Sequence, residues 1–340
     1  MRRWPPRLLI VASLGLHAFT AACYIRQPDM MAAFTVYPIW IWGLLGLFLA
    51  AAAFVFWRAP LSLMLVILWS LTLLIASDES HALARIGREA PEPGPSKPYA
   101  SQETLRICTL NWSGISHHKD EIKAQAELIA AYHPDILFLQ EIHPWQSRLI
   151  ADALYGGGGD YRTGADTSII TRWKVHVAIH NPMRHSQHAT LKLPATGSHP
   201  EGRLIDCVNV HLRSAKTDMH LWRKSCWQGH ADNRKLQRRE VAYSLAILKD
   251  STPFPTRPVV IAGDFNSPAS DPLHDLLRGN FNDSFGEAGT GWANTWHRRI
   301  SLHRIDYIYT TPLLKAVRSH TVIVPASDHR MLVSDFLLIP

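Results

Sequence analysis

The sequence lacks the short motifs of several well-known enzyme classes. Its four cysteines, Cys23, Cys108, Cys207 and Cys226, include no C-x-x-C pair of the kind found in zinc and redox sites. They are too sparse for a disulfide framework, so buried free thiols are expected, with a Cys207–Cys226 bridge as the alternative in an oxidising compartment. The sequence also contains no H-E-x-x-H motif, no Walker A loop and no G-x-S-x-G elbow. These absences argue against zinc hydrolases of that type, P-loop proteins and serine hydrolases.

Charged residues are missing from three apolar stretches near the N-terminus. Leu8–Ile25, Pro38–Trp57 and Leu61–Ser77 contain no internal Asp, Glu, Lys or Arg. Each approaches the roughly 20 residues that span a bilayer core, and tryptophans and tyrosines stand near their ends, as at a membrane interface. A signal peptide would explain only the first stretch. We therefore predict three transmembrane helices, at about 8–25, 38–57 and 61–77.

The positive charges around these stretches predict the orientation of the chain. Three arginines precede the first stretch and Arg58 separates the second from the third, which assigns both segments to the cytoplasm. An odd number of spans then carries the rest of the chain to the other side. We expect a multi-pass protein of the cell (inner or cytoplasmic) membrane with an extracytoplasmic domain.

The remaining chain divides into a linker and one domain. Residues 78–101 contain Pro91, Pro93, Pro95 and Pro98 and no apolar periodicity, which predicts an extended linker. Residues 102–340 are long enough for a single catalytic core. The formal net charge of +7 favours anionic partners.

In residues 102–340, short runs of β-branched and apolar residues alternate with amphipathic stretches, as in an α/β layered domain. The predicted strands are Leu105–Asn111, Ile136–Gln140, Thr167–Thr171, Leu204–His211, Val259–Gly263, Ile305–Tyr309 and Met331–Leu338, and the predicted helices are His118–Tyr132 and Asn233–Leu248. No repeat of solenoid period is present.

Polar residues that can carry chemistry lie at the ends of these strands. Because strand ends on a common edge converge, residues distant in sequence can form one site. The set comprises Asn111, Gln140, Glu141, His211, Asp264, Asn266, Asp306, Asp328 and His329. Most of the 19 histidines are expected at the surface, and His180, His185 and His188 belong to no motif.

Six fragments in this order resemble the endonuclease/exonuclease/phosphatase superfamily of metal-dependent phosphoesterases. They are Thr-Leu-Asn111, Leu-Gln140-Glu141, Val-Asn209-Val-His211-Leu, Gly263-Asp264-Phe-Asn266-Ser, Arg304-Ile-Asp306-Tyr-Ile and Ser327-Asp328-His329. The resemblance covers nearly all of Leu105–Leu338. It implies a four-layer α/β sandwich, in which two packed β-sheets are flanked by helices.

The resemblance and the chemistry of phosphate esters together assign roles to these residues. Glu141 is the best metal ligand, and by analogy Asn111 and Asp328 are ligands too. Such oxygen ligands suit Mg²⁺, with Mn²⁺ as a substitute. Catalytic roles go to Asp264 as base or water-orienting group, Asn266 as donor to phosphate, His329 and His211 as charge-stabilising groups, and Asp306 as the partner that orients His329. For Glu141 the alternative is a surface carboxylate, and Asp264 and Asn266 also fit an Asx-turn.

The segment Arg213–Arg239 is expected to recognise the substrate. After Arg213 it carries seven more lysines and arginines, interleaved with Trp222 and Trp227. Arg234 with Gln237 resembles a family R-x-x-Q element and is a candidate substrate-binding residue. This composition suits nucleic acid, an anionic membrane surface or a lipid phosphate, or forms a solvated helix start.

The three-span layout resembles a membrane-anchored bacterial subgroup associated with glycopeptide-antibiotic resistance, which implies an undecaprenyl-type substrate. The alternatives are a tethered nuclease acting on DNA or RNA and a phospholipid phosphodiesterase. A non-catalytic adaptor is disfavoured because no ligand or base of the motif set is missing. No obligate protein partner is evident; the expected partners are the lipid bilayer and an anionic phosphate substrate.

Overall fold

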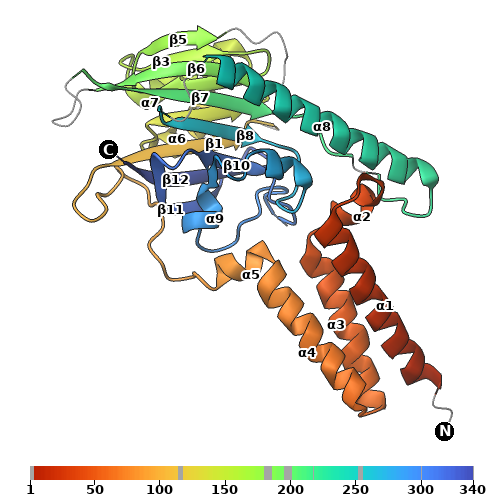
Figure 1. The fold of residues 1–340 in the computed structure, drawn as a ribbon. Helices are drawn as coiled ribbons and strands as arrows, with labels where there is room; N and C mark the ends of the chain where they lie inside the picture. Colours follow the sequence, from red (N-terminus) through yellow and green to blue (C-terminus); the bar gives the residue numbers. More distant parts are fainter. Residues whose placement is uncertain are drawn as a thin grey trace.

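The apolar N-terminal residues form long helices that pack side by side. The computed structural model describes residues 4–113, 118–179, 186–194, 201–216, 218–251, 256–299 and 301–339. The helices run away from the rest of the protein (Figure 1). The segment comprises α1 (Trp4–Arg26), the short η1 (Asp29–Met31) and α2 (Ala32–Thr35), α3 (Ile39–Phe56) and α4 (Pro60–Ala76).

Two of these helices have the length and composition of membrane spans. Pro6–Arg26 and Ile39–Phe56 qualify as candidates, and the first also fits a signal sequence by its position. The third predicted span corresponds to α4, an apolar helix of 17 residues that is shorter than the other two. The described residues therefore contain two clear candidate spans, not the three that were predicted.

A glycine allows the second and third helices of this bundle to approach closely. A Cβ atom on Gly46 of α3 would lie 2.0 Å from the Trp69 ring of α4. The Trp69 indole donates to Ser13 Oγ of α1 at 3.0 Å, and Ser13 donates to the Gly46 carbonyl at 3.1 Å. Small residues with interhelical hydrogen bonds are typical of helix packing in apolar surroundings.

The second region consists of two packed six-stranded sheets. The first has the strand order β11-β12-β1-β2-β4-β3 and the second β5-β6-β7-β8-β10-β9. The first sheet contains β1 (Thr104–Asn111), β2 (Ile136–Gln140), β3 (Asp160–Thr163), β4 (Thr167–Thr171), β11 (Leu314–Ile323) and β12 (Arg330–Leu338). The second contains β5 (Val175–Ile179), β6 (Ser186–Leu193), β7 (Arg203–His211), β8 (Val259–Asp264), β9 (Asn282–Asp283) and β10 (Asp306–Thr310).

Alternating apolar residues explain why the sheets pack face to face with helices outside. On β1, Ile107 belongs to the core between the sheets, whereas its neighbour Cys108 belongs to the outer core under α6 (Lys119–Ala130) and α7 (Pro144–Tyr155). On β8, Val260 faces inward and Val259 faces α8 (Lys224–Ser251). The predicted α/β sandwich of two sheets flanked by helices is confirmed.

The segment between the two regions differs from the extended spacer expected for residues 78–101. It begins with α5 (Asp78–Leu83), and its proline-rich part is bound to the sandwich. The buried Arg106 guanidinium donates to the carbonyls of Glu92 and Gly94 at 2.9 and 2.8 Å. A buried guanidinium needs acceptors for its N–H groups, and these carbonyls supply them.

The sandwich is also joined directly to the helical bundle. Helix α8 extends beyond the sheets and reaches α2 (Figure 1). Arg238 of α8 donates to both carboxylate oxygens of Asp29 at 2.7 Å. On the other side, Arg304 pairs with Asp78 at 3.0 Å, next to the short helices η2 (Pro272–Leu276) and α9 (Ser284–Ala288). One ion pair therefore joins the sandwich to the helical bundle, and a second joins it to α5, which directly follows the bundle.

Candidate active site

The register of three neighbouring strands brings the first site residues together. His211 at the end of β7 is paired with Asp264 at the end of β8, and Asp264 is paired with Asp306 at the start of β10. In the other sheet, Asn111 and Gln140 are register partners at the ends of β1 and β2. Gly263 permits this arrangement, because a Cβ atom there would lie 1.9 Å from the Val210 carbonyl oxygen.

Asp264 is the buried centre of the site. Its side chain is 1% exposed, and its two oxygens accept hydrogen bonds from Asn111 Nδ2 at 2.9 Å and from the Asn266 amide at 2.7 Å. Burial, followed by the nearby Asp306 carboxylate, raises the pKa of Asp264 to about 6. Such a carboxylate is ionised near neutral pH and still basic enough to accept a proton.

His329 lies beside Asp264 and is held by Asp306. Its Nδ1 is 2.9 Å from Asp306 Oδ2, and its Nε2 is 3.9 Å from Asp264 Oδ2. Burial lowers the pKa of His329, but the Asp306 carboxylate, with Asp264 and Asp328, outweighs this and raises it to about 10. The imidazole is therefore a buried cation at neutral pH, as expected for a group that binds phosphoryl oxygens.

His211 stands on another side of Asp264 with a carboxylate partner that the sequence did not reveal. Its Nδ1 is 2.8 Å from Asp166 Oδ2, and its buried Nε2 has no hydrogen-bond partner among the described residues. Burial lowers the pKa of His211, but the Asp166 hydrogen bond and the Asp264 charge raise it overall. Asp166 precedes β4, which is antiparallel to β2. The start of β4 therefore lies at the same edge as the end of β2, and this antiparallel pairing is the signal that could have identified Asp166.

Glu141, which is held by the buried Asn111, forms the open side of the site. Asn111 Nδ2 donates to Glu141 Oε1 at 3.1 Å as well as to Asp264, while its amide oxygen accepts from the Ser113 amide at 2.9 Å. The Glu141 side chain is 40% exposed and lies 3.7 Å from His211 Nε2. Glu141 has a backbone φ of 54°, a left-handed conformation that is rare outside glycine and asparagine and often found at functional sites.

Asn266 adopts a similar left-handed turn, with a φ of 49°. Its side-chain nitrogen donates to the Leu212 carbonyl at 3.0 Å, and its own amide donates to Asp264. The structure thus combines the Asx-turn at Asp264 with a position for Asn266 next to the buried carboxylate.

Two carboxylates of the site have the chemistry to hold a divalent metal. Glu141 offers an accessible carboxylate, and Asp328 Oδ1 is buried without a hydrogen-bond partner, so both fit a hard cation that takes oxygen ligands. Asp264, Asp306 and His329 also have ligand atoms within 4.8 Å of one another. A protonated His329 disfavours a cation in that second cluster, so the Glu141 side fits a metal better. Asn111 presents its nitrogen to this side and would have to turn its amide to act as a ligand.

Arg234 lies apart from these residues. Its side chain is 3% exposed, pairs with Asp271 at 2.7 Å, and donates to Thr35 of α2 at 2.6 Å. Together with Asn266 it lines a small cavity of about 20 Å³ beside the site. The four cysteines are free and buried, and Cys207 and Cys226 are not bridged. His188 is buried in β6, while His180 and His185 lie outside the described residues.

A profile of the endonuclease/exonuclease/phosphatase family matches residues 116–329, which is more than half of the chain. The chain belongs to this family. As a member of the endonuclease/exonuclease/phosphatase family, the protein is a hydrolase that acts on phosphate esters. No curated protein matches the sequence.

Solved structures of this fold resemble the sandwich region. A family protein from Bacteroides vulgatus is 18% identical, with a TM-score of 0.53 over 70% of this chain and 100% of that chain. TDP2 from D. rerio, solved with a single-strand DNA product, is 18% identical, with a TM-score of 0.52 over 69% and 99%. A mannosyl-6-phosphatase from Bacteroides thetaiotaomicron is 14% identical, with a TM-score of 0.50 over 68% and 99%. At these identities the likeness supports the fold alone.

Proposed function

We propose that this protein is a membrane-anchored, Mg²⁺-dependent phosphoesterase that hydrolyses a phosphate ester or pyrophosphate bond of a lipid-linked, undecaprenyl-type substrate on the extracytoplasmic side. The observation that carries the proposal is the convergence of two histidine–carboxylate pairs on the buried Asp264, in a domain joined by ion pairs to the apolar helical bundle and to α5 that follows it. The structural neighbours include a phosphatase and a protein solved with DNA. Both a lipid-linked phosphate and a nucleic acid would therefore be phosphate-ester substrates of the kind that this fold accommodates.

The residues of the site divide the reaction between them. Asp264 accepts the proton of the attacking water, since its carboxylate is ionised above a pKa of about 6. The protonated His329 donates to a phosphoryl oxygen and offsets its growing negative charge, with Asp306 holding the ring in place. His211, fixed through Nδ1 by Asp166, presents its free Nε2 to the phosphate from the opposite side.

Glu141 and Asp328 would hold the metal, with Asn111 as a third ligand after rotation of its amide. A bound Mg²⁺ supplies Lewis-acid stabilisation of phosphoryl and leaving oxygens, and Mn²⁺ serves as a substitute. Before that rotation, Asn111 connects the metal side to the base, because its Nδ2 donates to both Glu141 and Asp264.

The exposed surface of the helical bundle supports a membrane location. Only 22% of the residues in each candidate span are buried, unlike a core helix of a soluble protein. Large apolar side chains such as Val11, Phe48 and Ile75 are 67%, 69% and 69% exposed, and a soluble monomer rarely carries so large an apolar surface. We infer that α4 is the third span.

The direction of the helices supports the extracytoplasmic assignment. Helix α1 begins at the end of the bundle far from the sandwich, and α4 returns toward the sandwich (Figure 1). Arg7 in the first turns of α1 lies 5.6 Å from the centre of the Trp57 ring, so it shares the far end with the turn between α3 and α4 that contains Arg58. Positive charge at that end favours the cytoplasmic side.

Phosphate release by the detergent-purified full-length protein tests the function. The assay compares undecaprenyl pyrophosphate with single- and double-stranded DNA, each with Mg²⁺ and with EDTA. We expect EDTA-sensitive release from the lipid. Cleavage of DNA with an inert lipid would replace the proposal with a tethered nuclease. A C-terminal reporter that is active only outside the cytoplasm tests the orientation, and a silent fusion would reverse it.

A further inference from the structure

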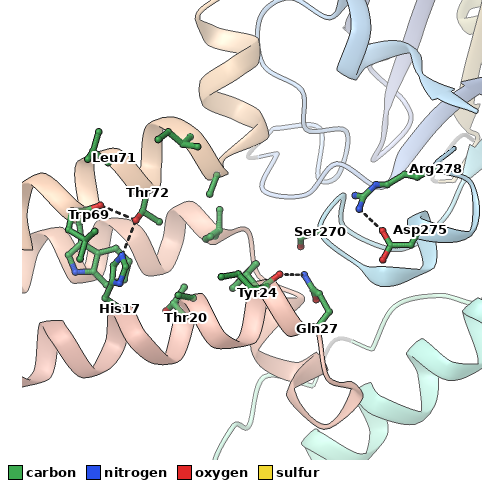
Figure 2. Close-up of a pocket in the computed structure, with 16 residues that line it drawn as sticks. His17, Thr20, Tyr24, Gln27, Trp69, Leu71, Thr72, Ser270, Asp275 and Arg278 are labelled. Atoms are coloured by element: carbon green, nitrogen blue, oxygen red, sulfur yellow. Dashed lines mark hydrogen bonds and ion pairs between the residues drawn. The ribbon is translucent and has the colours of Figure 1, made fainter.

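A groove of about 610 Å³ lies between α1 and α4, on the side of the bundle that ends at the sandwich (Figure 2). Within the bundle the two helices are joined by the hydrogen bond from Trp69 to Ser13 and by a 3.0 Å contact between His17 Nε2 and Thr72 Oγ1. Beyond these contacts they diverge toward α2 and α5 (Figure 1). The walls of the groove are mainly apolar, with Ile25, Leu71 and Ile75 among them.

The end of the groove nearest the sandwich is polar. Ser270, Asp275 and Arg278 of the sandwich line this end, and Figure 2 shows Arg278 paired with Asp275 across from Tyr24 and Gln27 of the bundle. The Arg278 side chain is 61% exposed despite its ion pair with Asp275. The groove therefore joins an apolar wall to a charged mouth, which matches an amphiphile with a hydrocarbon chain and an anionic head group.

The mouth of the groove adjoins a second cavity, which is lined by residues that lie close in sequence to the active site. A second cavity of about 310 Å³ shares Ile39, Ala76, Ser270 and Arg278 with the groove and continues to Arg304, two residues before Asp306. Ser270 follows Asn266 by four residues, so their Cα atoms are at most about 14 Å apart even if that segment is fully extended. A phosphate at the mouth is thus within reach of the site by a short displacement.

Two polar atoms distinguish the groove from a surface that only faces bulk lipid. Thr20 is 1% exposed and its Oγ1 has no hydrogen-bond partner, and Gln27 Oε1 is also unpartnered, among the described residues. Both residues line the groove. Buried polar atoms without partners are costly in apolar surroundings, and a slight opening of the groove would let an ester, phosphate or hydroxyl group of a bound ligand satisfy them.

We propose that this groove binds the hydrocarbon chain of a lipid-linked phosphate, with the phosphate directed to the mouth beside Arg278. The substrate then enters sideways from the bilayer, and its phosphate moves the remaining short distance from the mouth to the catalytic residues. The inference rests on the proposed function, because it assumes a lipid-linked substrate. A cavity of this volume lies within the roughly 300–1,000 Å³ typical of small-molecule sites, so it would hold part of a long chain.

Filling the groove tests the inference. Ala21 of α1 lines the groove, whereas Ala18 on the same helix is exposed and does not line it. Ala21→Trp should lower kcat/KM for undecaprenyl pyrophosphate at least tenfold relative to wild type, and less than twofold for the five-carbon isopentenyl pyrophosphate, which is too short to need the groove. Ala18→Trp should leave both values unchanged. Retained activity on the short substrate shows that the variant is folded.

Equal activity of the two variants on the long-chain substrate would overturn the inference while leaving the proposed function intact. A wild-type protein that hydrolyses isopentenyl pyrophosphate but not the long-chain lipid would overturn both. Photolabelling gives a readout that does not need turnover: wild-type protein in EDTA is irradiated with an undecaprenyl-type pyrophosphate that carries a diazirine in its chain. Labelling concentrated at residues 20–25 and 71–76 is the expected result, and labelling spread evenly over the exposed faces of α1, α3 and α4 contradicts it.

Discussion

The two halves of the active site hold a histidine by the same contact in different surroundings. His329 and Asp306 are separated by 2.9 Å and their side chains are 5% and 0% exposed, whereas His211 and Asp166 are separated by 2.8 Å with exposures of 12% and 44%. A carboxylate raises the pKa of an imidazole more strongly where water cannot screen its charge. The same kind of pair therefore gives a stable cation at His329, in the buried half of the site. At His211, in the open half, solvent screening makes the effect on the imidazole pKa weaker.

A third histidine shows what burial does without a carboxylate. His188 of β6 is 2% exposed, and neither ring nitrogen has a hydrogen-bond partner among the described residues. Burial lowers its pKa to about 4, the opposite direction to His329. Burial alone thus keeps an imidazole neutral, and the carboxylate partner is what makes a buried histidine a cation.

The largest effect is expected from the residue at the centre of the buried half. Asp264→Asn keeps the shape of the side chain and removes the proton acceptor, so kcat should fall by about 10³-fold or more. The measurement is phosphate release with Mg²⁺ from whichever substrate the wild type hydrolyses. Asp152→Asn on α7, whose side chain is 58% exposed, is the control and should retain full activity. Near-normal turnover by Asp264→Asn would contradict the assignment of the base.

The next effect concerns the carboxylate that makes His329 a cation. Asp306→Asn removes the charge that most strongly opposes the burial of His329, so the imidazole should lose its proton near neutral pH and kcat should fall by about 10²-fold or more. NMR titration of the His329 ring gives a second readout, in which its pKa should drop from about 10 toward the range of ordinary histidines. An unchanged pKa in the variant would show that Asp306 is not the cause.

The sequence predicted the buried half more completely than the open half. Asp264 and His329 belong to motifs at predicted strand ends, and the seven predicted strands agree with the structure within one residue. Asp166 was missed because it lies in a loop before a strand, and only the antiparallel pairing of β4 with β2 brings it to His211. The pairing of these strands is part of the tertiary structure and cannot be predicted from the local sequence.

The sequence also did not predict elements that contain buried polar residues with hydrogen-bond or ion-pair partners. Strand β11 contains Arg318, which is 3% exposed because Asp335 and Glu89 neutralise it, although an arginine in a sequence indicates a surface position. Helix α8 begins at Lys224 rather than at the predicted Asn233. Its first turns lack a periodic apolar face, and part of this end of α8 packs against the helical bundle through Arg234 and Thr35.

Because His188 has no carboxylate partner, it should make the free energy of unfolding fall at acidic pH. The pKa of His188 is about 4 in the folded protein and near 6.5 when unfolded. The unfolded state thus binds more protons between these values, and the stabilisation present above pH 6.5 is lost as pH falls toward 4. His188→Leu should reduce the loss in unfolding free energy between pH 7 and 4 by up to about 3 kcal/mol, measured by chemical denaturation. His176→Leu, at an exposed position of β5, should follow the wild type; an equal effect in both variants would refute the role of burial.

The smallest effect is expected in the open half. Asp166→Asn should lower kcat by tenfold or less, because the exposed carboxylate is already screened by water and solvent can replace part of its hydrogen bond to His211. The pKa of His211 should fall in the variant, since the Asp166 hydrogen bond is the strongest influence that raises it. Asp218→Asn is the matched control, because Asp218 forms a similar exposed pair with His220 at 2.6 Å and should be silent in both measurements. If Asp166→Asn instead cost as much as Asp306→Asn, exposure would not be what separates the two halves, and His211 would need the same fixed charge that His329 has.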